Sequence, residues 1–104
     1  MLKATNTAEK ECVYLYFMQL GDARYKEGML RQAAIDFERA AYYAKRDGLC
    51  KDSVRQAATK AYEAYFSAGG LTTFHNKQRS LNDAAWVAEE YGLDQRMTQP
   101  HKSN

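Results

Sequence analysis

Few side chains in this sequence are of the types that carry out nucleophilic, acid–base or metal chemistry. Its 104 residues include two histidines, His75 and His101, and two cysteines, Cys12 and Cys50. His75 lies beside an asparagine, without an adjacent cysteine or serine to form a nucleophile–base pair. The cysteines are far apart and lack the C-x-x-C spacing of a structural zinc site. We therefore expect no enzyme activity, no metal and no other cofactor, with His75 in an exposed loop.

Two further patterns do not fit a phosphate-binding or a nucleic-acid-binding site. The pair Gly69-Gly70 follows an expected helix and has no lysine partner, so it does not fit a phosphate-binding loop. Four basic residues cluster around Gly48, but aspartates interrupt them and no aromatic residues alternate with them. These four are Lys45, Arg46, Lys51 and Arg55. With a formal net charge of only +2, we expect no nucleic-acid partner.

Composition indicates one globular domain without a membrane span. The chain is 45% hydrophobic and contains eight tyrosines, four phenylalanines and one tryptophan, whereas disordered chains are poor in aromatic residues. Its longest uncharged apolar run, residues 12–18, is far shorter than the ~20 residues that cross a bilayer. The first seven residues have no apolar segment typical of a secretory signal. We expect a cytoplasmic protein with reduced thiols, although a single disulfide is formally possible.

Glycine spacing predicts four helices, at residues 8–27, 30–47, 52–68 and 80–91. Glycines follow each of these stretches, and glycine just past a helix end adopts the left-handed conformation that closes it. The intervening residues are rich in good helix formers, and nothing alternates with the period of a strand. The chain is therefore predicted to be all-α. Residues 71–79 fit either a loop or the first turns of a longer fourth helix.

Polar residues supply further start signals for these helices. Thr7 can cap the first helix, and Asp52 or Ser53 the third. Ser80 and Asp83 resemble a capping box for the fourth. In a hairpin turning near residue 28, Cys12 lies opposite about residue 45, roughly 7 Å along the axis from Cys50 at 1.5 Å per residue. That offset predicts free thiols.

Internal repetition predicts two helical hairpins. The pattern of residues 40–49 recurs at 84–93, a shift of 44, and the pattern of 23–28 recurs at 64–69, a shift of 41. We expect the three-residue difference to be an insertion within 71–79. Repeats of this length are typical of stacked units that bury one another's apolar faces. The predicted domain spans residues 1–94, with a disordered lead at 1–6 and a flexible tail at 95–104.

Residues 14–47 resemble a tetratricopeptide repeat. The resemblance rests on Phe17, Leu20-Gly21, Gly28, Ala33, Phe37 and Ala40, which fall at that family's offsets, while Arg24 replaces the usual aromatic residue. It implies two stacked antiparallel hairpins and an adaptor or chaperone-like role, with another protein or peptide as the partner. From packing alone, the same apolar residues are expected in the core, with Gly21 marking a close helix contact.

The resemblance also implies a partner-binding face on the inner side of the first helix of each hairpin. In the first hairpin this face is Leu15, Met18, Asp22, Tyr25 and Lys26. In the second it is Gln56, Thr59, Glu63, Phe66 and Ser67. The alternative for Met18, Tyr25 and Phe66 is that they pack against a neighbouring helix.

Tyrosine is frequent in this sequence, and tyrosine is enriched at protein interfaces. Two hairpins are also fewer than the three repeats that a stable stack needs. A second hypothesis is therefore a structural subunit that assembles into a homo-oligomer without a separate ligand.

Overall fold

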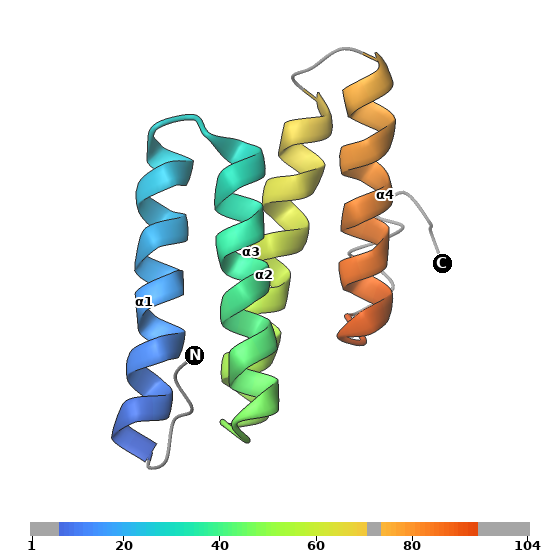
Figure 1. Ribbon diagram of the computed structural model, residues 1–104. Helices are drawn as coiled ribbons and strands as arrows, with labels where there is room; N and C mark the ends of the chain where they lie inside the picture. Colours follow the sequence, from blue (N-terminus) through green and yellow to red (C-terminus); the bar gives the residue numbers. More distant parts are fainter. Residues whose placement is uncertain (1–6, 71–73, 94–104) are drawn as a thin grey trace.

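The chain folds into four α-helices that form two antiparallel hairpins (Figure 1). The computed structural model describes residues 7–70 and 74–93. The helices are α1 (Thr7–Lys26), α2 (Leu30–Arg46), α3 (Lys51–Gly70) and α4 (Phe74–Glu90). No helix in these ranges is long and apolar enough to cross a membrane. The predicted all-α class and hairpin architecture are confirmed. The predicted lead, residues 1–6, and the predicted tail, residues 95–104, lie outside the described residues.

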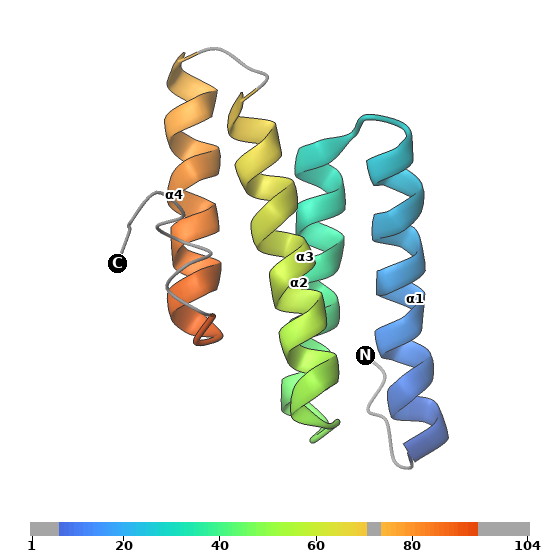
Figure 2. The same ribbon diagram turned by 180° about the vertical axis from the view of Figure 1, so that it is seen from behind.

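The second hairpin stacks against the first through its helix α3. Helix α2 packs against both α1 and α3, and α4 packs against α3. Figure 1 shows α2 on the near side of the stack, and the reverse view in Figure 2 shows α3 on the near side. The two hairpins therefore form two layers, with α1 and α3 in one layer and α2 and α4 in the other.

Three glycines end helices as their spacing predicts. Gly28, Gly48 and Gly92 have φ angles of 82°, 76° and 62°, a conformation that side chains with a Cβ rarely adopt. After α2, the Leu49 N–H donates to the Ala44 carbonyl at 2.9 Å. After α4, the corresponding bond joins residues 93 and 88 at the same distance. Both ends are closed by the same backbone hydrogen-bonding pattern.

Several predicted boundaries are wrong. Helix α4 begins at Phe74, so residues 74–79 are the first turns of a longer fourth helix, which is one of the two alternatives for 71–79, and the start at residue 80 is wrong. His75 therefore lies in a helix rather than in a loop. Helix α3 begins at Lys51, which places both of its predicted caps, residues 52 and 53, inside the helix. It also runs on through Gly69 and Gly70, and a Cβ built on Gly69 would lie only 3.0 Å from the Leu81 side chain of α4.

The two hairpins repeat with a single period of 44 residues. Helices α1 and α3 each contain 20 residues and begin at 7 and 51, whereas α2 and α4 each contain 17 and begin at 30 and 74. Burial follows the same period. The buried residues 14, 18 and 21 of α1 correspond to the buried residues 58, 62 and 65 of α3. The predicted shift of 41 and the insertion in 71–79 are therefore wrong.

Alanine and a few aromatic side chains form the core. The alanines of α2 and α3 are almost completely buried, and Phe37 is 2% exposed between α1, α2 and α3. A Cβ built on Gly21 would lie only 2.6 Å from the Phe37 ring. The predicted close contact at Gly21 is confirmed. Phe37, Ala33 and Ala40 are buried as predicted, and Phe17 and Leu20 are half-buried.

Candidate functional site

The residues predicted for the partner-binding face on α1 divide into exposed and buried members. Leu15 is 49% exposed and Tyr25 42%, and Asp22 and Lys26 are also exposed. Met18 is only 7% exposed and belongs to the core. Leu15, Asp22 and Lys26 are spaced by seven and four residues, so they share one side of α1. This row leaves an aliphatic side chain and both signs of charge accessible.

The corresponding residues of α3 form a second row, in which Glu63 and Phe66 are exposed and Thr59 is half-buried. Thr59, Glu63 and Phe66 follow the same helical spacing, and Phe66 is 50% exposed. One face of the Phe66 ring is stacked on Tyr62, with ring centroids 6.0 Å apart. Tyr62 itself is buried, so it holds the Phe66 ring in place. The other two predicted members of this set, Gln56 and Ser67, are exposed and half-buried respectively.

Polar contacts between α1 and α3 bring the two rows side by side. The Lys60 Nζ donates to Asp22 Oδ1 at 3.2 Å, and Tyr14 Oη lies 3.5 Å from Gln56 Oε1. Lys60 was not predicted as a site residue, yet its ammonium also lies 5.4 Å from the centroid of the Phe37 ring. Exposed ion pairs such as Asp22–Lys60 contribute about 0–1 kcal/mol. Asp22 and Lys60 can therefore give up this ion pair and bind charged groups of a ligand instead, at little cost in free energy.

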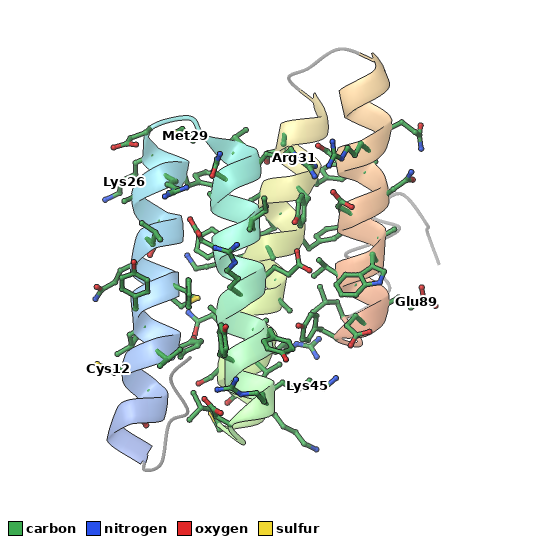
Figure 3. The ribbon with its side chains drawn as sticks, in the orientation of Figure 1. Cys12, Lys26, Met29, Arg31, Lys45 and Glu89 are labelled. Atoms are coloured by element: carbon green, nitrogen blue, oxygen red, sulfur yellow. The ribbon has the colours of Figure 1, made fainter. Side chains whose placement is uncertain are left out.

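A separate polar cluster joins α2 to α4. Arg31 reaches across from the start of α2 toward α4 (Figure 3), where it donates to Ser80 Oγ at 3.0 Å and to Asp83 Oδ2 at 2.6 Å. Its guanidinium also lies 5.3 Å from the Tyr65 ring centroid, and the Tyr65 hydroxyl donates to Glu38 at 2.7 Å. Ser80 and Asp83 therefore anchor α4 to α2 and do not cap a helix as predicted.

The environment of this cluster keeps the Tyr65 phenol protonated. Burial raises the pKa of Tyr65 well above its usual range, and the hydrogen bond to Glu38 raises it further. A phenol that holds its proton this firmly donates a hydrogen bond but does not act as a base near neutral pH. The cluster is therefore suited to holding the hairpins together.

Arg24, the residue that departs from the tetratricopeptide pattern, forms an ion pair across the first hairpin. Its Nε lies 3.3 Å from Oδ2 of the buried Asp36, and its Nη1 donates to Gln32 at 2.7 Å. Burial raises the pKa of Asp36, whereas the positive charges of Arg24 and Arg39 oppose that rise. The guanidinium thus supplies a partner for a carboxylate that would otherwise be buried alone.

The two cysteines are exposed and are not joined by a disulfide. Cys12 lies on α1 (Figure 3), and Cys50 immediately precedes α3. The Cys50 Sγ is 3.4 Å from Ser53 Oγ, and hydrogen bonding to Ser53 lowers the pKa of this thiol. The prediction of free thiols is confirmed.

Acidic and aromatic neighbours accompany the basic residues at the end of α2. Lys45 lies 3.9 Å from Glu90 and above the Tyr91 ring, and Arg46 lies 3.1 Å from Asp47. Lys51 and Arg55 are exposed at the start of α3. Among the side chains that the structure describes, those of residues 11–70 and 77–93, no three histidine, cysteine or acidic groups lie close enough together to hold a metal ion.

Comparison of the whole chain with known proteins found no matching protein family, curated protein or solved structure. The paired rows on α1 and α3 form a surface on which exposed apolar residues and both signs of charge come together.

Proposed function

We propose that this protein is an interaction module that binds another protein or peptide along the paired rows of α1 and α3. The observation that carries the proposal is the exposure of Leu15 and Phe66, each about half accessible, on two helices that the Asp22–Lys60 contact holds side by side. Burying large apolar side chains of this kind is the main favourable term in most protein associations. The charged residues between them supply orientation and partner selection.

The chemistry of the two rows defines the ligand. An elongated peptide with apolar side chains would cover Leu15 and Phe66, and its acidic groups would meet Lys26 or Lys60. Its basic groups would meet Asp22 or Glu63. The role assigned here is that of an adaptor or chaperone-like protein, with no catalytic step.

Two other observations support the proposal. Residues 14–47 resemble a tetratricopeptide repeat, a family that binds peptides on the equivalent face, although the 44-residue spacing of these hairpins exceeds that family's 34 residues. The exposed, unbonded thiols fit a reducing compartment such as the cytoplasm. We propose that the interaction takes place there.

A quantitative pull-down from the native source tests this function. Leu15→Glu and Phe66→Glu each place a charge in the apolar part of the face and are expected to remove the same partner. Tyr42→Glu is the matched control, because Tyr42 is similarly exposed but lies on α2, in the other layer. A partner set that is unchanged in both variants, or that is lost equally in the control, would refute the proposal.

A further inference from the structure

The 44-residue period allows the two ends of the stack to be compared position by position. On α2, Ala34, Glu38 and Ala41 form one row, and Glu38 accepts the hydrogen bond from Tyr65 of α3. Both alanines in this row are completely buried. Helix α3 therefore covers this side of α2.

The equivalent row of α4 is open. It consists of Gln78, Asn82 and Ala85, all of which are exposed. The adjacent Leu81, which corresponds to the buried Phe37 of α2, is half-buried. Among the residues that the structure describes, no helix occupies the place beside α4 that α3 occupies beside α2.

At the other end of the stack, helix α1 leaves accessible the row that α3 uses to pack on the first hairpin. Helix α3 presents Lys60, Ala64 and Ser67 on the side that faces the first hairpin, and these three are half-buried or buried. The equivalent row of α1 is Tyr16, Leu20 and Ala23. Tyr16 is 60% exposed, Ala23 is exposed and Leu20 is half-buried. A face used for packing in the second hairpin is thus accessible in the first.

The open row of α4 in one copy and the open row of α1 in a second copy fit together if the second copy packs on the first as the second hairpin packs on the first within the chain. The contact between Asp22 and Lys60 then becomes a contact between Phe66 and Tyr16 of the second copy. The contact between Phe37 and Lys60 becomes one between Leu81 and the same tyrosine. Each of these replacements pairs an apolar group with an aromatic ring, which favours association.

The charges also match. Lys45 of α2 and Glu90 of α4 lie 3.9 Å apart within the chain. One period further, Glu89 takes the place of Lys45, and Arg46 of the second copy takes the place of Glu90. The acidic residue now lies on the first hairpin of the contact and the basic residue on the second, the reverse of Lys45 and Glu90, so the two charges still attract. Figure 3 shows Lys45 at the α2 end that carries this contact and Glu89 at the same end of α4.

We propose that copies of this chain stack head to tail, with the α1–α2 hairpin of one copy packed on the α3–α4 hairpin of the next. The interface is heterologous, because the two surfaces that meet are different, so the assembly adds copies in one direction and does not close as a two-fold dimer. Each chain has two hairpins, so two stacked copies have four, which exceeds the three repeats that a stable stack needs. Phe66 belongs to both proposed surfaces, whereas Ala85 and Tyr16 lie outside the partner-binding rows, so the stacking is tested at Tyr16 and Ala85 and not at Phe66.

Sedimentation velocity with two blocking variants tests the stacking. Tyr16→Glu blocks only the first end and Ala85→Glu only the second. Both positions are exposed, so circular dichroism is expected to show folded helices in each variant. The wild type is expected to sediment faster as its concentration rises toward the millimolar range. Each variant alone is expected to remain monomeric.

The decisive sample is an equimolar mixture of the two variants. Each variant keeps the end that the other has lost, so the mixture is expected to form a heterodimer and nothing larger. The Tyr42→Glu control is expected to associate like the wild type. A wild type that stays monomeric, variants that still associate singly, or a mixture that stays monomeric would each overturn the proposal. The proposed function is refuted by a different result, a pull-down in which Leu15→Glu and Phe66→Glu both leave the partner set unchanged.

Discussion

Replacing Gly21 with alanine tests how closely α1 approaches α2. In an open helix this change stabilises by about 1 kcal/mol, because glycine is the poorer helix former. Here the new Cβ would lie 2.6, 2.7 and 2.9 Å from three carbons of the Phe37 ring. Distances under 3.0 Å require the ring or the helix to shift, and the ring is 2% exposed with the Lys60 ammonium 5.4 Å from its centroid.

The balance of these effects is expected to be destabilising. Overpacking a dense core costs about 1–3 kcal/mol, which exceeds the gain in helix propensity over most of that range. Gly21→Ala is therefore expected to lower the free energy of unfolding by up to about 2 kcal/mol in urea denaturation. Gly21→Leu adds more atoms at the same place and is expected to cost more.

Two controls separate packing from propensity. Gly70→Ala adds the same methyl group at the end of α3, where nothing lies within 4 Å, so it is expected to be neutral or stabilising. Phe37→Leu in the Gly21→Ala background removes the ring that the methyl group meets and is expected to show non-additive coupling with it. A Gly21→Ala protein as stable as the wild type, or more stable, would refute the close contact.

Three further results follow from the geometry. Burial raises the pKa of Tyr91 from 10.0 to about 12, so between pH 10 and 12 the folded protein keeps a proton that the unfolded chain loses. This contribution to stability is complete below pH 10 and is lost between pH 10 and 12. Tyr91→Phe is therefore expected to make the decline in melting temperature over that range shallower, and an unchanged slope would contradict this. Arg31→Met leaves the buried Ser80 hydroxyl without its partner and is expected to cost about 1–3 kcal/mol in urea denaturation, so a wild-type midpoint would show that the cluster does not hold α4 in place. Reductant is expected to leave the melting temperature unchanged, and a reductant-sensitive melt would contradict this. Cys50 is expected to react faster than Cys12 with a thiol reagent at neutral pH, because the pKa of Cys50 is lowered, and the reverse order of reactivity would contradict this.

The helix ends were predictable where a single residue type decides the backbone conformation. Gly28, Gly48 and Gly92 all adopt positive φ, which is a local property that the sequence displays directly. The start of α4 was not predictable in this way. Phe74, His75 and Asn76 are mediocre helix formers, and the close approach of Leu81 to Gly69 holds this part of α4 against α3. Tertiary packing overrides weak local propensity at such positions.

The same limit explains the misassigned motifs. Ser80 and Asp83 have the spacing of a capping box, but their partner, Arg31, is about fifty residues away, and no local pattern reveals it. The match of residues 23–28 to 64–69 placed Tyr25 and Phe66 at equivalent positions. The 44-residue period instead aligns Tyr25 with Gly69. An alanine-rich helix offers many near-equivalent alignments, and only packing distinguishes them.

On the partner-binding face, helical periodicity separated Leu15 from the core correctly, because Leu15 lies opposite the row that packs on α2. Met18 shares its side of the helix with Tyr14 and Gly21, which are buried, so the same periodicity accounts for its place in the core. The transfer of a family's offsets did not make this distinction. The role of Lys60 depends on a contact between two helices and has no signal in the sequence of either.

Site-specific photo-crosslinking in the native source tests the central claim most directly. A benzophenone side chain replaces Leu15 in one sample, Phe66 in a second and Tyr42 in a third, all of which are about half exposed. The account predicts that positions 15 and 66 crosslink to the same protein and that position 42 does not. Adducts from all three positions alike, no adduct at 15 and 66, or an adduct there of only a second copy of this chain would contradict the claim that the α1 and α3 rows bind a separate partner.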